Sequence, residues 1–307
     1  MILANEANNP TSPARREEGE IPMFTRRRIL HVAGMIVALA MLAACGGVSG
    51  PNFTVNTGGW SGEWPWFWPS KPTFTVYRDF SENVPVGGHG RIRLDAVNGE
   101  IVITGQPGAT SVTVTAELIV GSNVSRVDAE TGLTQLAVHV ADLSDEIFVQ
   151  TMQPKNMDGR QYIVNFTITV PSDLAVDVTQ VNGNVTVLDI ESSLFVEVEN
   201  GNVHLSDIFG FATVNVDNGS VDANVTLPPG GEIMVSVVNG DIDLRIPTAT
   251  SAELSALVGI GAITWDNLDL MNAVHTNKSL TGTLGDGTGL IDLDTRNGSI
   301  DVTGFNG

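Results

Sequence analysis

Short stretches of alternating apolar and polar residues follow one another along most of the chain, and many of them flank an Asn-Gly pair. In the stretch VEVENGNVHL, the apolar phase is made by Val196, Val198, Val203 and Leu205, and polar side chains fill the other phase. A period of two in Val-rich and Thr-rich segments is typical of strands with one buried face. Because Asn-Gly also suits tight turns, each stretch taken alone fits a β-hairpin equally well.

The recurrence of the pair favours a different structure. Six pairs are Asn98-Gly99, Asn182-Gly183, Asn200-Gly201, Asn218-Gly219, Asn239-Gly240 and Asn297-Gly298. They lie 84, 18, 18, 21 and 58 residues apart, and LVGIGAITW supplies a related corner 21 residues after Gly240. Spacings of 18–21 residues predict an all-β fold, a parallel β-helix or β-solenoid with stacked Asn-Gly corners. If coils also fill the long intervals, the chain forms about 11 coils.

Residues 105–171 follow the pattern less regularly. SVTVTAELIV, LTQLAVHV, EIFVQTM and YIVNFTITV are strand-like but lack the Asn-Gly corner, and VSRVDAETGLTQ is compatible with one helical turn. We expect this region to continue the same sheets with looser corners. A separate small β-domain is the alternative.

The last Asn-Gly unit ends at Val302, with no capping segment after it. An uncovered final coil exposes strand edges that invite pairing with other chains. We therefore expect residues 267–280 or a partner to cover this end, and self-association through the solenoid end is one form of such a partner.

The start of the chain carries an export signal. Arg26, Arg27 and Arg28 precede an apolar run, Ile29–Ala44, that ends in Leu-Ala-Ala-Cys. This resembles the bacterial lipobox, which implies cleavage between Ala44 and Cys45 and attachment of fatty acids such as palmitate to Cys45, the one cysteine in the chain. A buried thiol or an ordinary transmembrane helix are the alternatives.

These features divide the chain into three parts. Residues 1–44 form the signal peptide, with Met23 as the expected true start because the preceding residues are polar. The arginine run suits both the general and the twin-arginine export routes. Residues 45–73 form a Gly/Pro/Trp-rich linker, and 74–307 the solenoid. The linker tryptophans, which suit a membrane interface, a cap on the domain's apolar end or a carbohydrate platform, are Trp60, Trp64, Trp66 and Trp68.

The charge of the chain excludes several partners. The formal net charge is −20, and removal of residues 1–44 makes it −21. Such a surface repels nucleic acid and acidic glycans. A polysaccharide lyase acting on acidic glycans needs basic residues around its substrate, and the mature part holds ten, scattered along the chain.

No catalytic or metal-binding motif is present. The sequence lacks HExxH, a cysteine cluster, GxSxG and a Walker loop, so no catalytic residue and no cofactor are assigned. Acidic residues do gather near the corners and the C-terminal end: Asp217, Asp222, Asp241, Asp243, Asp286, Asp292, Asp294 and Asp301. Solvated surface acids are the favoured interpretation, and calcium bound between stacked carboxylates is the alternative.

The repeats resemble a known family. YIVNFTITVPSDLAVDVTQVNGNVTV and LTGTLGDGTGLIDLDTRNGSIDV are similar to the opening and closing segments of the bacterial DUF4097 family, also named "putative adhesin", over about Phe74 to Gly304. The resemblance implies an exported or membrane-associated β-helix and carries over no catalytic residues.

The sequence thus predicts a non-enzymatic lipoprotein of the bacterial cell envelope. It would be anchored by lipid to the cell membrane or outer membrane, outside the cytoplasm, and present an adhesin-like β-solenoid to an envelope protein or a glycan. An accessory or sensor protein in envelope-stress signalling and a β-helix polysaccharide-active enzyme are the alternatives.

Overall fold

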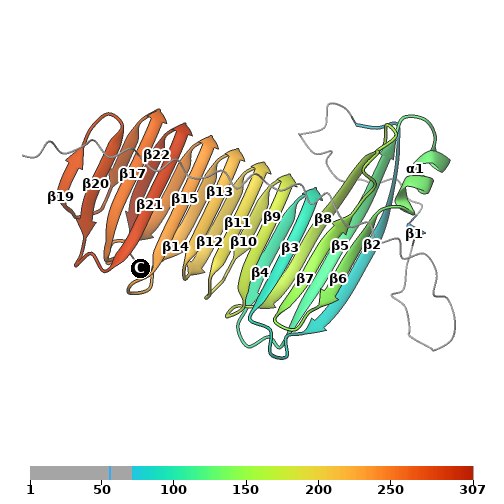
Figure 1. The fold of residues 1–307 in the computed structure, drawn as a ribbon, viewed down its shortest axis with the longest axis horizontal. Coiled ribbons are helices and arrows are strands. Elements are labelled where there is room, and N and C mark those ends of the chain that lie inside the picture. The colour runs from blue at the N-terminus through green and yellow to red at the C-terminus, as the bar shows by residue number, and fades with distance from the viewer. Residues whose placement is uncertain (1–54, 57–70, 307) are drawn as a thin grey trace, which may run out of the picture. The chain divides into compact units, whose positions relative to one another are not determined.

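Two mixed β-sheets of eleven strands each, with one helix, make up the part of the chain that the computed structural model describes, residues 55–56 and 71–306 (Figure 1). In spatial order, sheet I contains β1 (Val55–Asn56), β2 (Phe74–Pro85), β5 (Ser111–Ser122), β8 (Gln161–Pro171), β4 (Ile101–Gln106), β10 (Val185–Leu188), β12 (Val203–Phe209), β14 (Val221–Thr226), β16 (Ile242–Pro247), β22 (Ile300–Phe305) and β18 (Ile263–Asp266). Sheet II contains β19 (Leu270–His275), β20 (Ser279–Leu284), β17 (Ala252–Ile260), β21 (Gly289–Asn297), β15 (Glu232–Asn239), β13 (Ala212–Asn218), β11 (Leu194–Asn200), β9 (Ala175–Asn182), β3 (Arg91–Asn98), β7 (Glu146–Met152) and β6 (Ala137–Asp142). The helix is α1 (Arg126–Leu133).

In the middle of the domain the chain alternates between the two sheets. A strand of sheet II leads into a strand of sheet I through a corner whose second residue is a positive-φ glycine, Asn-Gly in six units and Ile260-Gly261 in one, and we call each such unit a coil. Each strand then pairs in parallel with the equivalent strand of the next coil, as Val196 does with Val214 and Val185 with Val203. The corner pairs are therefore turns between the two sheets and not hairpins.

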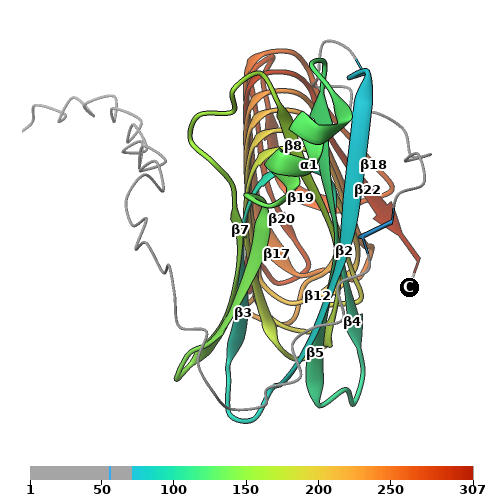
Figure 2. The same cartoon turned by 90° about the vertical axis from the view of Figure 1, so that its right-hand side faces the viewer.

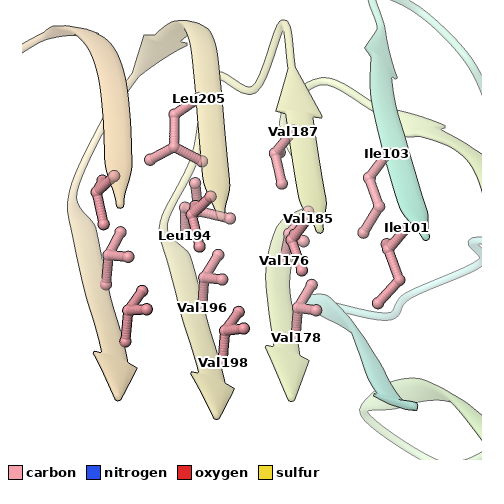
Figure 3. Packing of buried hydrophobic residues seen from close by; sticks show 14 of the residues in the cluster. Ile101, Ile103, Val176, Val178, Val185, Val187, Leu194, Val196, Val198 and Leu205 are labelled. Atoms are coloured by element: carbon pink, nitrogen blue, oxygen red, sulfur yellow. The ribbon is translucent and has the colours of Figure 1, made fainter. Parts of the chain in front are cut away.

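Side chains of one phase fill the space between the sheets. Val176 and Val178 of β9 face Val185 and Val187 of β10 across this space (Figure 3), and all four are at most 2% exposed. The alternation in the sequence places the polar phase on the outer faces. Full burial of each such aliphatic side chain is worth about 1.5–3 kcal/mol, so every coil depends on its neighbours for stability.

The order of the coils in space differs from their order in the sequence. Coil β3–β4 pairs directly with coil β9–β10, although Asn98 and Asn182 are 84 residues apart. Among residues 71–306 the stack contains seven coils with this glycine corner, in the order β3–β4, β9–β10, β11–β12, β13–β14, β15–β16, β21–β22 and β17–β18. The prediction of about 11 coils that fill the long intervals was wrong, because both intervals leave the stack and return to it.

The first long interval joins the stack by parallel pairing, of β7 with β3 and of β8 with β4, and beyond these strands it extends both sheets with antiparallel pairs. Strands β1, β2, β5 and β8 pair antiparallel in sheet I, and β6 pairs antiparallel with β7 in sheet II. The sheets are thus mixed, which corrects the expectation of a purely parallel fold. The expectation that residues 105–171 continue the same sheets agrees with this arrangement.

Helix α1 closes the core at this end. It lies between the two sheets in the view along the stack (Figure 2), and Ala129 and Leu133 join the hydrophobic core. Ser125 caps the helix by accepting a hydrogen bond from the Asp128 backbone N–H at 3.1 Å, which satisfies one free donor of the first turn. The helix spans eight residues, longer than the single turn that the sequence predicts.

The second long interval places the last Asn-Gly coil inside the stack. On one side β21 pairs with β15, where Asn297 is in register with Asn239, and β22 pairs with β16. On the other side β21 pairs with β17 and β22 with β18. Coil β17–β18 therefore precedes coil β21–β22 in the sequence but lies farther along the stack, so the final coil is an interior layer. Strands β20 and β19 extend sheet II further with antiparallel pairing. The expected uncovered coil at Val302 is thus covered mainly by residues 252–266. The expected segment 267–280 contributes through its first residue, since Asn267 Nδ2 donates to the Gly304 carbonyl at 2.7 Å.

No helix in the described residues is long and apolar enough to span a membrane.

Candidate functional site

The Asn-Gly corners stack in register and form a continuous ladder of side-chain amides. Each asparagine donates from Nδ2 to Oδ1 of the asparagine in the preceding coil of the stack. The five distances run from 2.8 to 3.0 Å, for Asn182 to Asn98, Asn200 to Asn182, Asn218 to Asn200, Asn239 to Asn218 and Asn297 to Asn239. Asn98 ends the ladder on one side by donating to the Tyr162 carbonyl at 3.1 Å. Ile260 takes the asparagine position in coil β17–β18 and ends it on the other.

A second ladder runs through the residue that follows each glycine. There a side-chain oxygen accepts a hydrogen bond from the backbone N–H of the next coil. The donor and acceptor pairs are Asn202 to Asn184, Ser220 to Asn202, Asp241 to Ser220 and Ser299 to Asp241, at 2.7–3.1 Å. Sequence reasoning missed these residues, although a small polar residue after nearly every Asn-Gly pair was a signal for them.

Two buried polar side chains mark the joins between coils that are distant in sequence. Gln180 Nε2 donates to the Gly99 carbonyl at 2.6 Å, and Thr295 Oγ1 donates to the Gly240 carbonyl at 2.9 Å. The register partners at this position in neighbouring coils are apolar: Ala96 and Val198 beside Gln180, and Val237 and Val258 beside Thr295. Gln180 and Thr295 therefore supply side-chain donors at the two places where coils separated by a long interval of sequence pair with each other.

The outer face of sheet I gathers acidic side chains into a column. The register pairs Asp222 with Asp243 and Asp243 with Asp301 on adjacent strands. A shallow depression of about 360 Å³ is lined there by Asp241, Asp243, Ala262, Thr264, Ser299 and Asp301. Burial raises the pKa of Asp243, and the nearby carboxylates of Asp222, Asp301 and Asp241 raise it further.

Few cations balance this acidic face. Arg245 contacts Asp222 at 3.2 Å, and His204 contacts the same carboxylate at 3.3 Å. No other ion pair is present along β10, β12, β14, β16, β22 and β18 in the described part of the chain. The outer side of sheet I therefore presents an anionic surface with carboxylates repeated from strand to strand.

The outer face of sheet II is also acidic, but it is more mixed. Burial raises the pKa of Asp177, Glu197 and Asp294. Near the α1 end, Arg93 pairs with Asp95 at 3.0 Å and lies 5.3 Å from the centre of the Phe148 ring.

The structure separates the acidic residues that the sequence grouped. Asp222, Asp243 and Asp301 lie on strands of sheet I, and Asp241 lines the depression beside them from the corner before β16. Asp217, Asp292 and Asp294 belong to strands of sheet II. Asp286 accepts hydrogen bonds from Ser251 and Thr288 in a turn, which lowers its pKa. No group of three or more His, Cys, Asp or Glu side chains is placed to hold a metal ion within residues 71–306.

The residues of the lipid anchor lie outside the described residues. This holds for Ala44 and Cys45, and for the four linker tryptophans at positions 60, 64, 66 and 68.

His89 joins two turns at the α1 end of the stack. Its Nδ1 faces the Val86 carbonyl, and its Nε2 faces the Leu143 carbonyl at 2.6 Å and the Asp142 carboxylate at 2.8 Å. Only the doubly protonated imidazolium donates from both nitrogens. The hydrogen bond to Val86 raises the pKa of His89 most, and those to Leu143 and Asp142 add to it.

This geometry predicts a pH-dependent contribution to stability. Because the folded pKa lies above the ordinary value of 6.5, the contribution is fully present below about pH 6.5 and is lost as the pH rises through the folded value. In urea unfolding from pH 5.5 to 8.5, wild type should therefore lose stability relative to His89→Gln as the pH rises. Asp142→Asn should reduce this difference, whereas parallel pH profiles for wild type and His89→Gln would contradict the assignment.

Comparison with known proteins finds similarity only to solved structures. No family model matches the chain, and no curated protein matches it. A "putative cell adhesion protein" from Clostridium sporogenes is 11% identical, over 75% of this chain and 100% of that one, with a TM-score of 0.42. A "putative adhesin" from Bacteroides fragilis is 14% identical over 73% and 96%, with a TM-score of 0.29. A "putative adhesin" from Parabacteroides merdae is 12% identical over 73% and 95%, with a TM-score of 0.20.

Proposed function

We propose that this chain is a non-enzymatic lipoprotein of the bacterial cell envelope that acts as an adhesin-like scaffold. Its seven coils would form a two-sheeted β-solenoid, held at the membrane through Cys45 and exposed outside the cytoplasm. The outer faces of the sheets would bind an envelope protein or a glycan.

The observation that carries this proposal is that the polar corner residues form hydrogen bonds with one another between adjacent coils. The repeated Asn-Gly-polar triplets form hydrogen bonds from coil to coil and so stabilise the stack. Few of their donors and acceptors are left to bind a substrate. A partner would instead meet broad sheet faces with side chains at fixed strand spacings, about 4.8 Å apart.

The charge of sheet I limits the chemistry of the partner. Asp222, Asp243 and Asp301 stand on three adjacent strands, with Arg245 as the nearby cation. An acidic glycan or nucleic acid would be repelled by this column, whereas a basic protein surface or a neutral glycan would not. We therefore assign the binding face to the outer side of sheet I.

Binding of the full chain to isolated cell envelopes tests this assignment. Asp243→Asn combined with Asp301→Asn removes two charges with almost no change of shape, and we expect weaker binding and a smaller effect of salt. The control pair is Asp292→Asn with Asp294→Asn on sheet II. Equal loss of binding by both pairs would contradict the assignment to sheet I. Turnover of a polysaccharide that a single Asp substitution abolishes would overturn the non-enzymatic proposal.

The anchor has its own test. Cys45→Ser removes the thiol that would carry the fatty acids, so we expect complete loss of metabolic labelling with palmitate and release of the protein from the membrane fraction. Ser49→Cys in the Cys45→Ser background serves as the control, because a displaced thiol should not restore labelling. Labelling of Cys45→Ser equal to that of wild type would refute the anchor.

A further inference from the structure

The pair that makes each corner is also chemically reactive. In an Asn-Gly sequence the glycine N–H loses its proton, and that nitrogen attacks Cγ of the asparagine side chain. A C–N bond forms, the amide nitrogen leaves as ammonia, and a cyclic succinimide remains. Water then opens the ring to aspartate, or to isoaspartate if the chain is rerouted through the side chain. Glycine favours this reaction because no Cβ hinders the approach of its nitrogen.

In the stack, both groups that must react are already engaged. Each of the six ladder asparagines donates its amide nitrogen to an oxygen, as Asn200 does to Asn182 at 3.0 Å. Each following glycine donates its N–H to a carbonyl of the next coil. These donors and acceptors are Gly99 to Asn182, Gly183 to Asn200, Gly201 to Asn218, Gly219 to Asn239, Gly240 to Asn297 and Gly298 to Ile260, at 2.9–3.0 Å. The attacking and leaving nitrogens are thus both held away from reaction while the coils remain stacked.

The protection is uneven along the ladder. Asn98 is 4% exposed and donates to the Tyr162 carbonyl in the interior. Asn297 is exposed, and coil β17–β18 is the one coil beyond it in the described stack, with β20 and β19 pairing further out in sheet II. Within the described coils no amide donates to Asn297 Oδ1, because its neighbour in the ladder is Ile260, which is itself 70% exposed. Local opening of the last coils would therefore release Asn297 before the other rungs.

The chain contains an Asn-Gly pair that the ladder does not include. Asn306 is exposed and precedes Gly307. Its Oδ1 accepts a long hydrogen bond of 3.5 Å from Thr248, and its Nδ2 has no hydrogen-bond partner among residues 71–306. It therefore provides an internal reference of the same dipeptide without the ladder.

We propose that the stacked corners are latent deamidation sites that the amide ladder protects, and that modification enters the stack at Asn297 and proceeds inward. Conversion of Asn297 replaces its Nδ2 donor with a carboxylate oxygen that faces Asn239 Oδ1. It also adds a negative charge near Asp241, which accepts the Ser299 N–H in the second ladder. One event therefore breaks a rung, introduces repulsion and loosens the coil that protects the next asparagine.

Peptide mapping by mass spectrometry tests this proposal on the full chain. The protein is incubated at pH 8, folded in one sample and in urea in the other, and conversion at each Asn-Gly pair is followed with time. In urea all seven pairs should convert at similar rates. In the folded sample Asn306 should keep nearly its unfolded rate, while the ladder sites slow by about tenfold or more, with Asn297 the fastest of them and Asn98 the slowest. Folded ladder sites that convert as fast as Asn306, or Asn98 ahead of Asn297, would overturn the proposal.

A variant that lengthens the ladder separates its effect from general burial. Ile260→Asn supplies an amide in register with Asn297, at a corner where Gly261 already has the required positive φ of 146°. We expect conversion at Asn297 to slow by about threefold or more, since one more hydrogen bond must open. Leu257→Asn, on the same strand but outside the ladder, is the control and should leave Asn297 unchanged. An equal effect of both variants would show that the ladder is not the cause.

Discussion

Gly183→Ala is expected to destabilise the domain by about 3–5 kcal/mol, as measured by urea unfolding. Gly183 has a φ of 131°, a conformation beyond the left-handed helical region that an L-residue rarely adopts and that costs it about 1–3 kcal/mol. Its added Cβ would also lie 1.8 Å from the Gly99 carbonyl oxygen of the neighbouring coil. The atoms that this Cβ would meet, the carbonyl oxygen and carbon of Gly99, belong to the backbone of a hydrogen-bonded stack. Because they cannot rotate away as a side chain could, the coils must separate at this corner.

Gly230→Ala separates the two causes of this effect. Gly230 also has a positive φ, 73°, but an added Cβ there would meet nothing within 4 Å. It should therefore cost only the conformational part, about 1–2 kcal/mol. Equal destabilisation by the two variants would mean that stacking of the corners does not require the absence of a Cβ.

Ile291→Asn is expected to destabilise the domain by about 4 kcal/mol or more, and to open coils that precede it in the sequence. Ile291 is fully buried in β21, which lies between β15 and β17. The substitution removes a core side chain and leaves a buried amide without a partner. Since the last coil is an interior layer, hydrogen exchange should increase in β17, β18 and β20 as well as in β21.

Leu290→Asn is the matched control. Leu290 is the adjacent residue and is 39% exposed on the outer face of sheet II. We expect it to change stability by less than about 1 kcal/mol and to leave the protection of β17 and β18 unaltered. If Ile291→Asn increased exchange only in β21 and β22, the final coil would be a terminal layer, and coil β17–β18 would not cover it.

The local structure of a coil follows from the sequence alone. The alternation around Asn200 assigns Val196, Val198 and Val203 to the core, and all three are at most 1% exposed. The Asn-Gly pair marks each corner, because glycine is the residue that tolerates the positive φ and the close contact there. The acidity of the outer faces is likewise a property of composition, as is the lack of recognisable catalytic motifs.

The candidate binding face needed the structure. Asp222, Asp243 and Asp301 are far apart in the sequence, and the phase of each strand shows only that each carboxylate points outward. Their alignment into one column depends on which coils are neighbours. The sequence shows which residues occupy the corner positions of the two ladders. Their hydrogen bonds depend on the corners being in register, which only the structure shows.

The sequence by itself thus determined the coil, its inward and outward faces and its corner, whereas the tertiary structure decided the order of the coils. The physical reason is that the coils are nearly equivalent. Each one offers the same aliphatic interior and the same Asn-Gly edge, so local pattern cannot distinguish a neighbour 18 residues away from one 58 residues away. The choice rests on contacts between distant segments, such as Thr295 with Gly240 and the antiparallel pairing of β20 with β17. Such contacts exist only once the whole domain has folded.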